Sequence, residues 1–218
     1  SAYFDKSKKV KKKIEGLKEA LDRFRQEIKE LQEKNTDFIE EQSRKKILPK
    51  KSEHWYDSYR WFISSEGVLC IGGRDATQNE ILIKKHTEPT DLVFHSEITG
   101  SPFFIIKTEK KTPGEATLQE CAQITASYSR AWRRRLSSAE VYHITPEQVS
   151  KTANSGEYLT KGSFMIRGKR TQYHPSVKLT IGLHDGNIIA GTLASVSSKT
   201  NTHFTISPGE HKLSEAAK

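Results

Sequence analysis

Residues 61–83, W-F-I-S-S-E-G-V-L-C-I-G-G-R-D-A-T-Q-N-E-I-L-I, decide the fold of this 218-residue chain. Two bulky, β-favouring runs at 61–63 and 68–71 are separated by a Ser-Ser-Glu-Gly turn, and together they predict a hairpin. Thr77 and Glu80 have the spacing of a capping box just before an apolar run, so we expect a helix to start near Thr77.

The double glycine in this stretch predicts an anion-binding corner. Gly72 and Gly73 let the backbone bend and let another molecule approach it closely. Free amide groups at a helix start, together with Arg74, favour a phosphate there. The alternative is a well-capped turn that holds no ligand, because strand-glycine-helix corners are common in α/β proteins.

The charge balance favours a polyanionic partner. The chain has 36 Lys and Arg against 27 Asp and Glu, a net charge of +9. Basic patches attract phosphates and release counterions, which favours nucleic acid or an anionic membrane surface over ordinary solubility charge.

The sequence has no transmembrane-length apolar run and no signal-peptide core, so we expect a soluble cytoplasmic protein without a membrane partner. Cys70 and Cys121 match neither a zinc nor a disulfide pattern, so we expect reduced core residues and neither metal nor cofactor.

Heptad spacing marks residues 1–49 as a coiled-coil arm. The apolar positions alternate by four and three: Val10, Ile14, Leu17, Leu21, Phe24, Ile28, Leu31 and Phe38. This pattern predicts one strand of a long, protruding coiled coil. The chain has no second heptad segment, so the partner is a second copy or an upstream helix, and we favour the upstream helix. Because the chain opens Ser-Ala-Tyr, we expect it to be a piece of a longer protein.

Residues 50–218 alternate strand and helix patterns. Strands are predicted at 91–98, 103–107, 140–144, 162–167, 177–184, 187–193 and 203–207, and a helix lying across the sheet at 115–133. Asp185-Gly186 predicts a tight hairpin. The fold class is therefore α+β, with a mixed or largely antiparallel sheet and packed helices, preceded by the coiled-coil helix.

Three basic stretches in this domain predict contact with RNA. They are residues 130–135, Lys151 with Lys161, and residues 167–170, with aromatic side chains interleaved. Arginines near aromatics suit a phosphate backbone and unpaired bases. For Trp132 we favour a core position, and the arginines after it would also stabilise a helix C-terminus.

An enzyme is the alternative interpretation. Asp75, His95 and Glu97 could form part of a metal-dependent nuclease or an RNA-modifying enzyme. No recognised catalytic motif accompanies them, and a strand histidine beside a carboxylate is more often structural. We therefore predict a protein that is not an enzyme, with no catalytic or metal-binding residues.

Four motifs carry a family resemblance: W-F-I-S-S-E-G, I-G-G-R-D-A-T-Q-N-E, D-L-V-F-H-S-E-I-T-G and V-S-K-T-A-N-S-G-E-Y-L-T-K-G-S-F-M-I-R-G-K. Over residues 54–170 the chain resembles the RNA-binding R domain of the NFACT proteins, a family that includes NEMF, Caliban, RqcH and fibronectin-binding protein A. The heptads resemble the second half of the family's middle coiled coil, and the tail from Val177 is most similar to archaeal members.

The resemblance implies a factor of ribosome-associated quality control. Such factors bind a stalled large ribosomal subunit that carries peptidyl-tRNA, and they support C-terminal tailing of the nascent chain. The family's tRNA-selecting motif lies in an N-terminal domain outside this chain, so the resemblance implies binding of rRNA, tRNA and ribosome without tailing by this piece alone. An adhesin is suggested only by the historical name of bacterial relatives. Thr99 stands where many relatives have a second histidine, which weakens a catalytic role for His95.

The basic clusters and the positions that match the family motifs together give the predicted RNA-binding residues. They are Gly72, Gly73, Arg74, Asp75, Gln78, Asn79, Lys84, Lys85, His95, Arg133, Arg134, Arg135, Ser150, Lys151, Thr152, Lys161, Arg167, Lys169 and Arg170.

Overall fold

The computed structural model describes residues 14–30, 54–152 and 159–210 of the chain. The chain divides into two compact units, Ser1–Lys51 and Ser52–Lys218. Residues 14–30 of the first unit are helical, and the apolar side chains of the predicted seam are each at least 48% exposed in this part: Ile14, Leu17, Leu21, Phe24 and Ile28. Pairing of this helix therefore stays a prediction. The remaining heptad positions lie outside the described residues.

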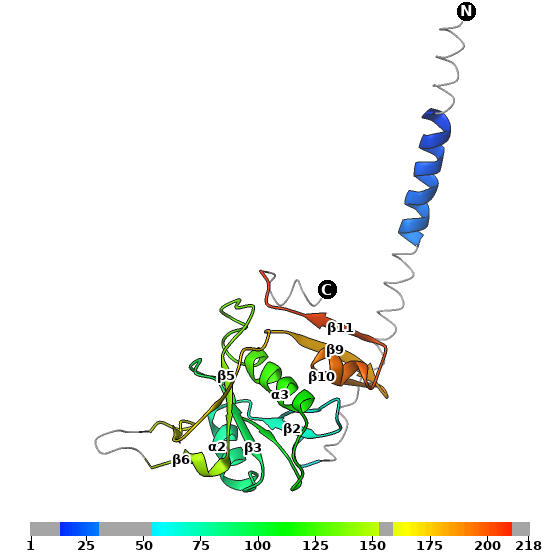
Figure 1. Ribbon diagram of the computed structural model, residues 1–218. Helices are drawn as coiled ribbons and strands as arrows, with labels where there is room; N and C mark the ends of the chain where they lie inside the picture. The colour runs from blue at the N-terminus through cyan, green and yellow to red at the C-terminus, as the bar shows by residue number, and fades with distance from the viewer. Residues whose placement is uncertain (1–13, 31–53, 153–158, 211–218) are drawn as a thin grey trace, which may run out of the picture. The chain divides into compact units, whose positions relative to one another are not determined.

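A six-stranded sheet forms the centre of the second unit (Figure 1). Its strands are β1 (Arg60–Ile63), β2 (Leu69–Gly72), β3 (Leu92–His95), β4 (Phe104–Ile106), β5 (Val141–Ile144) and β8 (Thr171–Tyr173), in the order β1-β2-β4-β3-β5-β8. Every neighbouring pair is antiparallel. The fold is thus α+β, and of the two predicted sheet types the antiparallel one is found.

Helices lie on both faces of this sheet because its central strands are apolar on both sides. On β4, Phe104 and Ile106 belong to the core cluster that includes Cys121 and Ile124 of α3 (Glu115–Ser127). Ile105 points to the other face and packs in a cluster with Leu82 of α2 (Ala76–Lys85). As predicted, α3 lies against the sheet, and the two cysteines are free and buried in its core. None of the helices in the described ranges is long and apolar enough to cross a membrane.

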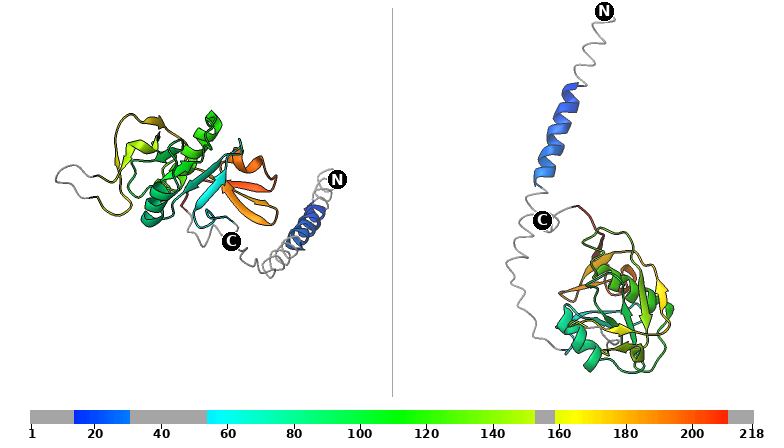
Figure 2. Two further views of the ribbon diagram at one scale, coloured as in Figure 1. Left: turned by 90° about the horizontal axis from the view of Figure 1, so that it is seen from below. Right: turned by 90° about the vertical axis from the view of Figure 1, so that its left-hand side faces the viewer.

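The last strands form a second sheet instead of extending the first. Its order is β10-β9-β11, from β9 (Leu179–His184), β10 (Asn187–Gly191) and β11 (His203–Ile206) (Figure 2). The predicted tight hairpin is confirmed, since Asp185 and Gly186 both have positive φ and join paired strands. A short helix, α4 (Leu193–Ser197), covers one face, where Val196 Cγ1 lies 2.6 Å from the site of an added Cβ on Gly182.

Helix α3 ends six residues before its predicted end at residue 133. The Ser127 hydroxyl donates to the carbonyls of Gln123 and Lys178, and the Ser129 hydroxyl donates to Ala126. Such local side-chain bonds compete with the helical pattern, and the chain continues in turns. Two short elements were also not predicted: η1 (Pro146–Gln148) and β6 (Val149–Ser150). β6 pairs with β7 (Met165–Ile166), which is the shorter observed form of the strand predicted at 162–167.

The first turn of α3 receives its cap from the β1–β2 hairpin. The N-cap residue Gly114 has no side chain, and Glu66 accepts hydrogen bonds from the Thr117 backbone N–H (3.0 Å) and hydroxyl (2.5 Å). These bonds lower the pKa of Glu66. A Cβ on Gly114 would lie 2.0 Å from Glu66 Oε1, so the glycine makes room for the carboxylate.

Candidate nucleic-acid interface

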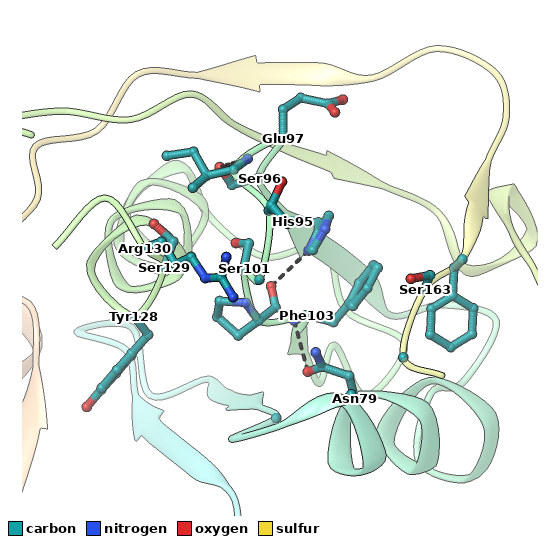
Figure 3. Close-up of a pocket in the computed structure, with 18 of the residues that line it drawn as sticks. Asn79, His95, Ser96, Glu97, Ser101, Phe103, Tyr128, Ser129, Arg130 and Ser163 are labelled. Atoms are coloured by element: carbon teal, nitrogen blue, oxygen red, sulfur yellow. Dashed lines mark hydrogen bonds between the residues drawn. The ribbon is translucent and has the colours of Figure 1, made fainter. Parts of the chain in front are cut away.

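A polar cavity of about 640 Å³ opens at one side of the main sheet (Figure 3). It is bounded by the corner between β2 and α2, the loop that follows β3, the turns that follow α3, and the segment that contains β7. Four separate parts of the sequence therefore meet there. We call it the basic cavity.

Cationic side chains outnumber carboxylates in the lining of the basic cavity. Six cations line it, Arg60, Arg74, Arg130, Arg133, Lys161 and Arg170, against the carboxylates Asp75 and Glu97. Aromatic rings lie beneath some of these cations: Arg60 is 4.8 Å from the Tyr128 ring centre and Arg170 is 4.6 Å from that of Tyr142. The cavity thus combines net positive charge with aromatic surface, which suits a phosphate-bearing ligand.

Three of the six cations, Arg60, Arg74 and Arg170, already have bonding partners within the protein. Arg60 Nη1 donates to the Gly73 carbonyl at 2.6 Å, and Arg74 Nη2 donates to the Tyr59 carbonyl at 3.1 Å. Arg170 forms an ion pair with Glu97. By contrast, the side chains of Arg130, Arg133 and Lys161 have no hydrogen bond or ion pair within the described residues, so their charges are available to a ligand.

The glycine corner is tightly closed. Gly73 N–H donates to the Phe103 carbonyl, and a Cβ on Gly73 would lie 2.2 Å from Asn79 Oδ1. Asn79 Oδ1 in turn accepts from the Phe103 backbone N–H at 3.2 Å. A Cβ on Gly72 would lie 2.4 Å from the Phe104 ring. Both glycines have negative φ, so close packing and not a special backbone conformation requires them.

Helix α2 starts within one residue of the predicted position, but its cap differs from the predicted one. Asp75, not Thr77, is the N-cap, and its Oδ1 accepts from the Gln78 N–H at 2.9 Å. The Arg74 N–H donates to Gln78 Oε1 at 3.0 Å. The predicted capping box is wrong because the aspartate two residues earlier reaches the same helix end. Its carboxylate also places a negative charge where the sequence predicts an anion.

Glu80 instead connects α2 to the segment before β7. It forms ion pairs with Lys84 (2.7 Å) and Lys151 (3.2 Å) and accepts from the Gly162 N–H (3.3 Å). The Lys84 bond, followed by those from Gly162 and Lys151, lowers the pKa of Glu80 to about 2. Lys151 also lies 4.6 Å from the ring centre of Phe164. Of these two predicted RNA-binding lysines, Lys151 therefore joins another segment to α2, whereas the Lys84 pair lies within α2.

The His95 ring forms part of the floor of the basic cavity. It stacks on Phe103 with ring centres 3.9 Å apart, and its Nδ1 lies 3.0 Å from the Pro102 carbonyl oxygen. Burial lowers the pKa of His95, although the Pro102 bond and Glu97 oppose this. In the neutral ring Nδ1–H donates to Pro102, which leaves Nε2 as a hydrogen-bond acceptor.

The loop after β3 brings a serine and an arginine together. Gly100 has φ +79°, and a Cβ there would lie 2.8 Å from Arg130 Nε, so the guanidinium packs against this loop. The next residue, Ser101, is only 4% exposed, and its hydroxyl has no hydrogen-bond partner in the described structure. Figure 3 shows both side chains at the same side of the cavity.

The structure brings eight of the nineteen predicted residues to the basic cavity. They are Gly73, Arg74, Asp75, Asn79, His95, Arg133, Lys161 and Arg170. The other eleven do not line it: Gly72, Gln78, Lys84, Lys85, Arg134, Arg135, Ser150, Lys151, Thr152, Arg167 and Lys169. Arg135 forms an exposed ion pair with Glu210 at 3.3 Å.

Several lining residues were not in the predicted set, including Arg60, Ser101, Tyr128 and Arg130. Arg130 belongs to the basic stretch 130–135, which is a usable signal. Arg60 and Ser101 have no such signal in the sequence. Strand pairing brings Arg60 to the cavity, and the loop after β3 brings Ser101 there.

The residues of the alternative nuclease have other partners. Asp75 caps α2, Glu97 pairs with Arg170, and His95 contacts a backbone carbonyl. Among the described residues there is no group of three or more His, Cys, Asp or Glu side chains that could hold a metal ion. No observation in the described part of the chain favours this alternative.

Fold and cavity together define an α+β domain suited to a polyanionic ligand. The family model "NFACT protein RNA binding domain" matches residues 58–168, which is more than half of the chain. The chain therefore belongs to this family, as the motifs predict.

Curated relatives extend the likeness. The chain is 45% identical over 150 residues to the archaeal Rqc2 homologue aRqcH of Methanocaldococcus jannaschii, covering 67% of this chain and 22% of that protein. It is 39% identical over 184 residues to the ribosome quality control complex subunit NEMF homologue of Drosophila melanogaster, covering 83% and 18%. It is 38% identical over 178 residues to the human ribosome quality control complex subunit NEMF, covering 80% and 16%. The chain thus matches between 16% and 22% of the length of these three relatives.

Proposed function

We propose that this chain is the RNA-binding module of a cytoplasmic ribosome-associated quality control factor, and that RNA lies across the basic cavity. The observation that carries the proposal is the charge of the cavity lining, six cations against two carboxylates. RNA is the partner because its phosphates release their bound counterions when they contact such a basic surface, and because its unpaired bases stack on aromatic rings.

The ribosomal setting of the proposal is supported by the relatives, which are named as ribosome quality control subunits. In this setting the RNA is rRNA and tRNA of a stalled large subunit that carries peptidyl-tRNA, and the module supports C-terminal tailing of the nascent chain. Residues 1–49 act as a coiled-coil arm, paired with a helix upstream in the same protein or with a second copy, and residues 50–218 act as the RNA-binding domain. No catalytic step belongs to this chain.

A salt titration tests the proposal. The affinity of the 218-residue chain for labelled tRNA and for a large-subunit rRNA fragment is measured by fluorescence anisotropy between about 50 and 200 mM salt. We expect the logarithm of affinity to fall linearly with the logarithm of salt concentration. The triple variant Arg130→Ala, Arg133→Ala, Lys161→Ala should reduce the slope by about two, since each phosphate contact with unpaired RNA contributes roughly 0.7.

The matched control is Lys178→Ala, because Lys178 is exposed, also cationic, and absent from the lining of the cavity. It should change the slope by less than one unit. RNA binding that does not respond to salt, or an equal loss of slope in the control, would contradict the proposal. Sedimentation of the chain with purified large subunits then tests the ribosomal setting separately.

A further inference from the structure

The buried serine of the basic cavity has a hydroxyl without a partner. Ser101 is 4% exposed, lines the cavity, and is the one described residue with a fully buried side-chain oxygen or nitrogen that makes no hydrogen bond. Buried polar groups in proteins are nearly always hydrogen-bonded, so an exception at a cavity indicates a partner supplied by a ligand.

Two arginines of the cavity lining favour an anionic ligand. The Arg130 guanidinium packs against Gly100, the residue before Ser101, and Arg133 lies one turn further along the same segment. Neither arginine is neutralised within the described residues, and both line the cavity. A hydroxyl with two unpaired guanidinium groups can donate several hydrogen bonds to the oxygens of one phosphate.

The opposite part of the cavity presents hydrogen-bonding groups beside flat rings. Asn79 Oδ1 already accepts from the Phe103 N–H, so its Nδ2 donor is left for a ligand. His95 Nδ1 faces the Pro102 carbonyl, which leaves Nε2 as an acceptor. Phe164 meets Phe103 edge to face. Figure 3 shows Asn79, His95 and Phe103 around one space. A donor and an acceptor beside aromatic rings suit the edge of a nucleobase.

The volume of the cavity suits a single nucleotide. Its volume of about 640 Å³ is in the range of small-ligand sites. A paired base inside a helix cannot enter such a space, because its hydrogen-bonding edge is turned to its partner and its faces are stacked. A paired helix could therefore touch the rim with its phosphates, but it would leave the interior empty.

We propose that the basic cavity receives one unpaired nucleotide of the bound RNA, with its phosphate against Ser101, Arg130 and Arg133 and its base against Asn79 and His95. This inference rests on the proposed RNA-binding function and narrows it to single-stranded or bulged RNA. The phosphate is the shared chemistry of RNA and free nucleotides, so the test includes a nucleoside monophosphate as competitor.

The experiment compares three labelled RNAs with the same number of phosphates: a fully paired two-strand duplex, a duplex with a one-nucleotide bulge, and a single strand. The 218-residue chain should bind the bulged and single-stranded RNAs about tenfold more tightly than the fully paired duplex. Ser101→Ala and Arg130→Ala should each reduce this preference to about threefold or less. Arg134→Ala removes the same charge outside the cavity, so it should weaken all three RNAs equally and keep the preference.

A stability measurement separates binding from structure at Ser101. Its hydroxyl makes no bond in the free protein, so Ser101→Ala should leave the thermal midpoint unchanged or raise it while the preference falls. A nucleoside monophosphate at millimolar concentration should compete with the bulged RNA more strongly than inorganic phosphate does.

Each other outcome contradicts the inference. Equal binding of the three RNAs overturns it but leaves the proposed function in place, whereas absence of RNA binding overturns both. A lower thermal midpoint for Ser101→Ala without loss of preference would assign the hydroxyl a structural role and overturn the inference. A preference that survives in the Arg130→Ala variant would also overturn it.

Discussion

Two glycine-containing connections border the basic cavity, and they are built in different ways. In the corner at Gly73, the backbone groups and the Asn79 side chain bond to each other, and Asp75 satisfies the helix start. In the loop at Gly100, the neighbouring hydroxyl of Ser101 has no partner and Arg130 lies against the loop without an ion pair in the described chain. A sequence motif rich in glycine can therefore be structural, while a plainer loop beside it holds the groups available for binding.

The largest expected effect is on stability, at the corner. In Gly73→Ala the added Cβ would lie 2.2 Å from Asn79 Oδ1 and 2.8 Å from its backbone N, and the backbone cannot move aside cheaply. We expect a loss of about 3 kcal/mol in the free energy of unfolding, measured by urea denaturation. Gly209→Ala is the control, because Gly209 is not in the left-handed region and a Cβ there would meet only the Ser207 carbonyl oxygen, at 4.0 Å. If both variants lose the same stability, the corner is not closed as described.

The loop should respond differently. Gly100→Ala combines a φ of +79° with contact to the flexible end of Arg130, which can move away. We expect a stability loss of about 1–2 kcal/mol, from the backbone strain. Affinity for RNA should fall severalfold as Arg130 is displaced, and anisotropy would measure it. Gly67→Ala has a similar φ of +80° and should match the stability loss with no change in RNA affinity. An unchanged affinity in Gly100→Ala would contradict the role given to Arg130.

The helix cap allows charge and stability to be separated. Asp75→Ala should destabilise the protein by about 1 kcal/mol, because the Gln78 N–H loses its acceptor. Asp75→Asn keeps an acceptor and should change stability by less than about 0.5 kcal/mol. Both variants remove a negative charge from the cavity, so both should bind RNA about two- to threefold more tightly at low salt. Weaker RNA binding by Asp75→Asn would instead show that the carboxylate itself helps to hold RNA.

The smallest effect concerns pH. Burial lowers the pKa of His95 below the ordinary 6.5, so the unfolded chain binds a proton more readily than the folded one. The contribution of the neutral His95 ring to the free energy of unfolding is fully present above pH 6.5. It is lost as the pH falls from 6.5 to the lowered pKa, by at most about 1.4 kcal/mol per pH unit. His95→Asn keeps a donor for the Pro102 carbonyl and should flatten the profile. His86 and His143 also have lowered pKa values, so part of the slope should remain. An identical slope in the variant would contradict the lowered pKa of His95.

Much of the fold follows from local pattern. The runs at 61–63 and 68–71 became β1 and β2 with shifts of one residue, and the Asp185-Gly186 pair formed the expected hairpin. Here the side-chain alternation and the turn residues agree with the tertiary structure. Strand β8 was not predicted because Gln172 and Thr171 are exposed and Tyr173 alone is buried, so it has no apolar run.

The cavity could be predicted only in part. Arg133, Lys161 and Arg170 belong to visible basic clusters, and the structure brings them to one cavity. Their neighbours Arg134 and Lys169 do not line it, because successive residues in turns point in different directions. Ser101 enters through the antiparallel pairing of β4 with both β2 and β3, which no local pattern encodes. The β1–β2 hairpin was predicted, but Arg60 lies one residue before its predicted first strand.

The cap that Glu66 provides for α3 links elements that are far apart in sequence. Its carboxylate bonds to Thr117, 51 residues later, while Gly114 offers no side chain of its own. The first turn of α3 therefore depends on the hairpin for its completion, and the two should gain protection from hydrogen exchange together during refolding. Circular permutants opened within the β1–β2 turn would separate this pair and should leave the first turn of α3 frayed.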